Sequence, residues 1–173
     1  NVLQIGTEAP PVTADAGKLV WQPGWQKAGG VAPIQVDRLD GKGGRVCVEG
    51  TACYDGLERW LRTVDWDASS MQADDDVAFK GDAKNIVLFR WHLGTNAEIN
   101  ITGENGHFTV SWADAAIDIA ADAPVLLEQT KLPDNTLANH TSEDDPKNIH
   151  TCLVVRTKEP VAKVVIHTRV EAR

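Results

Sequence analysis

The sequence is short of long apolar runs and of cysteine. No stretch of its 173 residues approaches the roughly 20 apolar residues that a helix needs to cross a bilayer, and the start lacks the basic and apolar regions of a signal peptide. Three cysteines (Cys47, Cys53 and Cys152) without a C-x-x-C pair exclude a dense disulfide scaffold and a cysteine-based metal cluster. Cys47 and Cys53 can pair if they face each other across a turn, and buried free thiols are the alternative.

Positive charge and catalytic motifs are also scarce. Seventeen basic against twenty-five acidic residues give a net charge of -8, the wrong sign for binding nucleic acid or anionic lipid through the overall field. No G-x-S-x-G, P-loop, G-x-G-x-x-G or H-E-x-x-H motif occurs, and the scattered acidic residues single out no pair for glycoside hydrolysis. The sequence therefore shows no self-contained active site, and neither a nucleic-acid nor a membrane partner is expected.

Short segments rich in β-branched and aromatic residues make up most of the chain. Hydrophobic residues are 42% and charged residues 24% of the composition, as in ordinary globular domains, so a single domain over 1–173 is expected. Turn-forming stretches at 41–44, 103–106 and 111–116 separate the segments. This pattern predicts an all-β fold, an antiparallel two-sheet β-sandwich with long loops. Strands are predicted at 45–54, 59–66, 85–93, 97–102, 107–112, 115–120, 125–130, 150–157 and 162–170.

Three segments depart from the simple strand pattern. The stretch 54–64 also fits an amphipathic helix, because Leu57, Trp60, Leu61 and Val64 follow helical spacing, but its Trp, Thr and Val content favours a strand. Residues 6–33 are rich in Gly, Pro and Ala and should form a loop with a short central strand. Residues 131–149 are polar and predict a long exposed loop.

The strand predicted at 85–93 carries two side chains that burial alone does not explain. One of its faces is wholly apolar, whereas the other begins apolar and ends with Arg90 and His92. A histidine at a strand end can be a metal ligand and an arginine can meet a carboxylate, but a histidine and an arginine at the sheet rim are the simpler interpretation. The run Asp74 to Asp76 most often forms a solvated turn. If residues 64–79 pair with 85–93, one of these aspartates points at the face that carries His92.

Six tryptophans are many for this length. Trp21 and Trp25 lie in the Gly/Pro-rich segment, where an exposed indole can stack on a sugar ring, and Lys27 and Arg38 are nearby in sequence. This pattern supports a hypothesis of non-catalytic carbohydrate binding. The remaining four lie in predicted strands and are expected in the core: Trp60, Trp66, Trp91 and Trp112.

The order of several motifs resembles a known family. The motifs are NVLQIG at 1–6, DGLERWLRTVDW at 55–66, an Asp-x-Val at 75–77, AKNIVLFRWHLGTNAEI at 83–99 and HTCLVVRTKEP at 150–160. Together they resemble the C-terminal β-sheet domain of heparinase II/III-like polysaccharide lyases. These enzymes join an N-terminal α/α toroid to a β-sandwich and cleave acidic polysaccharides by β-elimination. The resemblance implies a bacterial protein that is periplasmic or secreted.

The resemblance also implies where the chemistry lies. In that family a tyrosine and histidines remove the proton next to the uronate carboxylate and protonate the leaving oxygen, and most of them belong to the toroid or the junction. The chain is therefore expected to be a C-terminal fragment without the toroid, with no catalytic residue and no activity alone. It would act on an acidic polysaccharide only with that missing domain. A purely structural sandwich is the remaining alternative.

Site residues follow from the resemblance in the same way. Some relatives hold a structural zinc in the sandwich, and by position its ligands map to His92 and to Asp75 or Asp76, with a further ligand from elsewhere because zinc takes at least three protein ligands. Zinc is the one cofactor that the resemblance implies. The residues expected to contact substrate are Trp21, Trp25 and Arg90.

Overall fold

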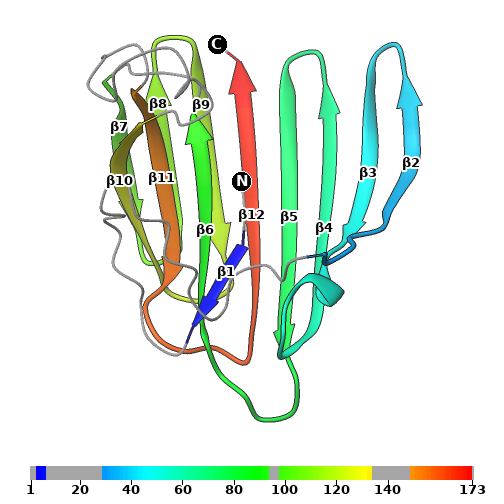
Figure 1. Cartoon of the computed structure of the whole chain (residues 1–173). Coiled ribbons are helices and arrows are strands. Elements are labelled where there is room, and N and C mark those ends of the chain that lie inside the picture. The colour runs from blue at the N-terminus through cyan, green and yellow to red at the C-terminus, as the bar shows by residue number, and fades with distance from the viewer. Residues whose placement is uncertain (1–2, 7–28, 94–97, 134–148, 173) are drawn as a thin grey trace.

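Two antiparallel β-sheets make up the protein. The computed structural model describes residues 3–6, 29–93, 98–133 and 149–172. A smaller sheet of four strands packs on one side of a larger sheet of eight strands (Figure 1). The predicted all-β, two-sheet antiparallel sandwich is confirmed. Among the described residues, no helix is long and apolar enough to span a membrane.

Each sheet is a continuous antiparallel ladder. The larger sheet, in spatial order, contains β2 (Ile34–Asp40), β3 (Gly43–Glu49), β4 (Leu57–Asp67), β5 (Ser70–Phe79), β12 (Lys163–Ala172), β9 (Ala115–Ala121), β8 (His107–Trp112) and β7 (Asn100–Glu104). The smaller sheet contains β1 (Leu3–Gly6), β6 (Ile86–Leu93), β11 (Ile149–Thr157) and β10 (Val125–Pro133). A single 3-10 turn, η1 (Thr51–Cys53), lies between β3 and β4.

Short turns join the hairpins at the predicted places. Strands β2 and β3, β7 and β8, and β8 and β9 are each connected by two residues within the predicted turn stretches. In the β7–β8 hairpin, Asn105 and Gly106 have φ of 52° and 106°, the positive values that a type I′ turn requires of both central residues. Asn and Gly tolerate these values best, so the sequence itself specifies the hairpin.

The core lies between the facing sides of the two sheets. Phe89 and Val155 of the smaller sheet belong to the same buried cluster as Val77, Ile119 and Ile166 of the larger one. Burying each such side chain contributes about 1.5–3 kcal/mol. Within the described ranges, β2 and β3 contribute no residue to this cluster. Figure 1 shows these two strands at the edge of the molecule, to the side of the smaller sheet.

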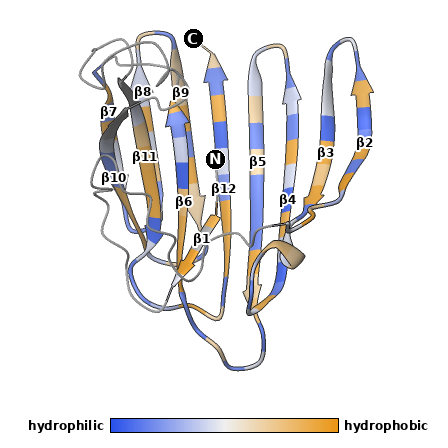
Figure 2. Ribbon diagram, in the orientation of Figure 1, coloured by the Kyte–Doolittle hydropathy of each residue, from blue (hydrophilic) through white to orange (hydrophobic). Residues whose placement is uncertain are grey.

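The segment that fits both a helix and a strand is a strand. Its residues lie in β4, where Trp60, Arg62, Val64 and Trp66 alternate along one face of the sheet. The period of two therefore prevails over the helical spacing, because β3 and β5 supply hydrogen-bond partners on both sides. Figure 2 shows the alternation of hydrophobic and hydrophilic residues along the strands of the larger sheet.

The strand predicted at 45–54 is too long. Strand β3 ends at Glu49, and η1 follows after Gly50, whose amide donates to the carbonyl of Trp60. Tyr54 then turns inward and donates from its hydroxyl to the carbonyl of Leu3 at 2.7 Å. This long-range bond ties the turn to β1, a tertiary contact that local propensity does not reveal.

The acidic run does not form a solvated turn. Asp74 to Asp76 lie in the middle of β5, which pairs with β4 and β12 in the larger sheet. The condition under which one of them would point at His92, a pairing of 64–79 with 85–93, is not met, because β6 belongs to the smaller sheet and pairs with β1 and β11. Alternation gives each aspartate its own surroundings, and Asp75 is the one that is buried.

Strands β1, β2 and β5 are not among the predicted strands, because β1 is only four residues long and the polar and charged residues of β2 and β5 interrupt the apolar pattern. The two predicted loops fall partly outside the described residues. From 6–33, the structure describes Gly6 and 29–33, and from 131–149 it describes 131–133 and Ile149, which belong to strands β10 and β11.

Candidate interaction surface

One face of the larger sheet packs against the smaller sheet, and we call it the inner face. This face extends beyond the smaller sheet as far as the edge strand β2. Register places its side chains in three rows that cross β2, β3, β4, β5 and β12 in turn. The rows are Leu39–Gly44–Trp66–Met71–Val170, Val36–Val46–Val64–Ala73–Thr168 and Ile34–Val48–Arg62–Asp75–Ile166. The alternation that places apolar side chains in the core thus continues as far as the outermost strand, β2.

The outermost residue of each row is largely exposed. In the third row, Ile166 is 1% exposed and Ile34 is 66% exposed. Val36 and Leu39 end the other two rows at 57% and 71%, and Val31, just before β2, is 70% exposed. We call the inner-face residues of β2, together with Val31, the open extension. Apolar side chains grouped at an edge in this way mark a surface that contacts another molecule or domain.

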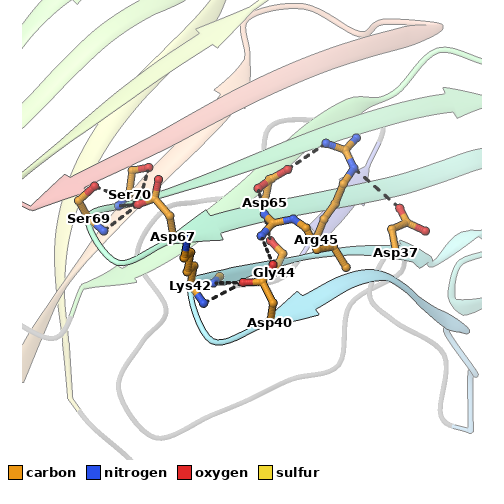
Figure 3. Close-up of polar contacts among 11 residues, drawn as sticks. Asp37, Asp40, Lys42, Gly44, Arg45, Asp65, Asp67, Ser69 and Ser70 are labelled. Atoms are coloured by element: carbon orange, nitrogen blue, oxygen red, sulfur yellow. Dashed lines mark hydrogen bonds and ion pairs between the residues drawn. The ribbon is translucent and has the colours of Figure 1, made fainter.

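The opposite, outer face of the same strands is saturated with ion pairs (Figure 3). Asp65 of β4 accepts from Arg38 at 3.0 Å and from Arg45 at 3.1 Å, and Arg45 lies 3.8 Å from Asp37. These groups are 35–48% exposed, so each pair contributes little by itself. The outer face of these strands thus carries paired charges, whereas their inner face carries apolar side chains.

An ion pair marks the boundary between the core and the open extension. Arg62 donates from Nε to Asp75 Oδ1 at 2.8 Å and from a terminal nitrogen to Oδ2 at 2.9 Å. Trp60 Nε1 also donates to Asp75 Oδ1, at 2.9 Å. The guanidinium carbon lies 5.6 Å from the ring centroids of Trp60, Phe89 and Trp91. The Asp75 side chain is 1% exposed, and this bidentate pair compensates for its buried charge.

This cluster joins the two sheets. Trp60 and Arg62 come from β4 of the larger sheet, whereas Phe89 and Trp91 come from β6 of the smaller one. Cation–π contact with three rings holds the guanidinium in an apolar setting. The cluster therefore fixes the position of β4 against β6. It also marks the place where the smaller sheet stops covering the inner face of the larger sheet.

The indole ring of Trp66 lies over Gly44, next to the open extension. A Cβ added to Gly44 would lie 2.2 Å from Cζ2 and 2.4 Å from Cη2 of the Trp66 ring, so the indole rests directly on the Gly44 backbone. Gly44 is buried while Trp66 is partly exposed. Trp91 is buried, and Trp60 and Trp112 pack against the core, which agrees with the prediction for these three. Trp66 differs, since in the described part of the chain it is not among the residues packed on the core cluster.

The predicted metal ligands are not brought together. Asp75 lies on the inner face of the larger sheet with Arg62, and Asp76 accepts from Arg59 at 2.8 Å. His92 is exposed on β6, and its neighbours Trp91 and Leu93 point into the core, so His92 points to the far side of the smaller sheet. Across the described residues, no group of three His, Cys, Asp or Glu side chains is arranged to hold a metal. The residues described do not fit the zinc site that the resemblance implies.

The other predicted residues are spread over the molecule. Arg90 shares the outer side of the smaller sheet with His92 and is half-buried, and burial lowers the pKa of its guanidinium. Arg38 belongs to the ion pairs of the outer face. Trp21, Trp25 and Lys27 lie outside the described residues. Cys47, Cys53 and Cys152 are free thiols, so the Cys47–Cys53 pairing is not formed.

The residues that sequence reasoning missed are those of the open extension. Their signal is present in the alternation of Ile34 and Val36, but the charged residues Asp37, Arg38 and Asp40 obscure it. The register shift between Val36 and Arg38 also breaks the period, so that Leu39 rather than Arg38 returns to the inner face.

The same fold is found in solved structures of polysaccharide lyases. No family model matches the sequence, and no curated protein sequence is significantly similar to it. A heparinase III, the BT4657 gene product, matches with a TM-score of 0.52 and 16% identity over 81% of this chain and 21% of that chain. Heparan sulfate lyase HepC from Pedobacter heparinus matches with a TM-score of 0.52 and 12% identity over 80% of this chain and 21% of that chain.

The chain shares its fold with part of these lyases. At this level the resemblance seen in the sequence is confirmed. The matched region is about a fifth of the length of each lyase chain. In those structures a sandwich of this kind is therefore one part of a much longer polypeptide.

Proposed function

We propose that this chain is the β-sandwich domain of a polysaccharide lyase that cleaves acidic polysaccharides by β-elimination and that it is inactive alone. The observation that carries the proposal is the open extension, an apolar face that continues the core beyond its cover, on a fold shared with heparan sulfate-type lyases. The occupant of this face is the catalytic domain of the same enzyme. Its presence is supported by the four-fifths of the similar lyase chains that lie outside the match.

The chemistry would then take place on residues of that other domain. In β-elimination a base removes the proton from the carbon next to the uronate carboxylate, and a carbon–carbon double bond forms as the bond to the leaving oxygen breaks. An acid protonates that oxygen, so no water is consumed. In this proposal the sandwich contributes by docking, and the base and the acid come from the other domain. A periplasmic or secreted location follows from this proposal.

The test compares the natural polypeptide that contains this sequence with the 173-residue chain. Both are incubated with heparan sulfate and other acidic polysaccharides, and unsaturated uronate is followed by its ultraviolet absorbance. The natural polypeptide is expected to form the product and the 173-residue chain is not. Product formed by the chain alone would contradict the inactive-domain proposal, and no product from either would contradict the lyase proposal.

A variant tests the docking face itself. Ile34→Lys together with Val36→Lys places two charges on the open extension without entering the core, because both side chains are already exposed. In the natural polypeptide this change is expected to lower activity at least tenfold. Gln35→Lys is the matched control, since Gln35 is exposed on the outer face of the same strand. Equal loss in both variants would show that the open extension has no special role.

A further inference from the structure

Trp66 and Gly44 form a flat surface whose geometry the docking role does not require. We infer that the exposed face of the Trp66 indole is a subsite for a pyranose ring of the polysaccharide. The inference deepens the proposed function and rests on it for the identity of the polysaccharide. It concerns a ligand at the inner face of β4, whereas docking uses the residues of β2.

The first argument is the orientation of the ring. Three atoms of the six-membered ring of Trp66 lie 2.2–2.9 Å from where a Cβ of Gly44 would stand, so the ring lies over the glycine and its other side is turned away from the sheet. The aromatic face carries partial negative charge and attracts the weakly positive C–H groups on the apolar face of a pyranose. An edge-on indole would offer only a narrow rim, so the flat orientation is the one that suits a sugar.

The second argument is what surrounds the ring. Leu39 and Gly44 precede Trp66 in the same row, and Met71 follows it, so the indole lies in an apolar floor that runs across β2 to β5. The charged residues next to Gly44 and Trp66 by register are one residue along each strand and therefore on the outer face, namely Arg45, Asp65 and Asp67. Arg62, on the inner face, is already paired with Asp75. Nothing charged on the described part of this row opposes a sugar.

The third argument is the glycine. Any Cβ at position 44 would overlap the indole ring, so only glycine permits the flat arrangement. Gly44 is not in a positive-φ conformation, which leaves the close approach of the ring as the reason for its small size. The two residues thus act as one unit, with Gly44 in a positioning role and Trp66 as the surface that touches the ligand.

The experiment titrates the 173-residue chain with a heparan sulfate hexasaccharide and follows the six indole N–H signals by NMR. The Trp66 signal, assigned by its loss in Trp66→Phe, is expected to shift the most. Affinity is expected to fall at least tenfold in Trp66→Ala and less in Trp66→Phe. Gly44→Ala, which tilts the ring, is also expected to weaken binding. Thr63→Ala, on the outer face of the same strand, is the control and should bind as the unchanged chain does.

Two results would overturn the inference. One is a titration in which the Trp66 signal stays in place, and the other is an affinity of a folded Trp66→Ala variant equal to that of the Thr63→Ala control. Activity of the natural polypeptide separates this from the proposed function. A lyase whose KM and kcat are unchanged by Trp66→Ala leaves the function standing and removes the subsite. If the polypeptide forms no unsaturated product but its binding of the hexasaccharide depends on the Trp66 indole, the subsite stands and the proposed function is removed.

Discussion

The covered and uncovered halves of the inner face are built from the same pattern and differ in what lies above them. Ile34 and Ile166 occupy the two ends of one cross-strand row, at 66% and 1% exposure. Both are isoleucines on strands of alternating pattern. Alternation therefore decides on which face of the sheet a side chain lies. How much that side chain contributes to the free energy of unfolding depends on whether a second sheet covers it.

The largest expected effect lies at the boundary of the two halves. Arg62→Ala leaves the carboxylate of Asp75 buried without its bidentate partner, and the free energy of unfolding is expected to fall by about 3–5 kcal/mol. Urea denaturation followed by tryptophan fluorescence measures it. The double variant Arg62→Met with Asp75→Leu removes both charges and should recover most of the loss. A single variant that costs less than about 1 kcal/mol would show that the pair is not desolvated.

The two ends of the row give the most direct comparison. Ile166→Ala creates a cavity between the sheets and is expected to cost about 2–5 kcal/mol, whereas Ile34→Ala should change stability by less than about 0.5 kcal/mol. Both are measured by the same urea titration of the 173-residue chain. Similar costs at the two positions would mean that the open extension is covered in solution, for example by a second copy of the chain.

High pH is expected to loosen the covered half at Tyr54. Burial, the main cause, raises the pKa of Tyr54 from 10 to about 12. The stabilising contribution of the protonated hydroxyl is therefore complete below about pH 10 and is lost as pH rises through about 12. The urea midpoint of the unchanged chain should fall over that window more than the midpoint of Tyr54→Phe. Parallel pH profiles for the two proteins would contradict the assignment.

The smallest effect is expected on the outer face of the open half. Arg45→Ala removes ion pairs with Asp37 and Asp65, all of them substantially exposed, and should cost less than about 1 kcal/mol. The loss should shrink further when salt is added, because screening weakens exposed pairs. A larger loss that is independent of salt would show that the outer-face network, rather than the apolar rows, holds the β2–β3 hairpin in place.

Local pattern was sufficient for the strands and for several turns. The alternation of Trp60, Arg62, Val64 and Trp66 specifies a strand with one apolar face, and Asn105–Gly106 specifies a hairpin turn. These signals are carried by residues close together in the chain. The sandwich class follows from many such segments with no helical stretch between them.

What the sequence determined by itself is therefore the face that each side chain takes, and what only the tertiary structure decided is which faces meet. Asp75 and His92 are the plainest case. Alternation places each on a definite side of its strand, but the pairing of β5 with β12 and of β6 with β11 puts them on different sheets. The open extension is the second case, because nothing in β2 records that the smaller sheet ends before reaching it. Strand pairing and sheet packing join residues far apart in the chain, and a period of two contains no information about such partners.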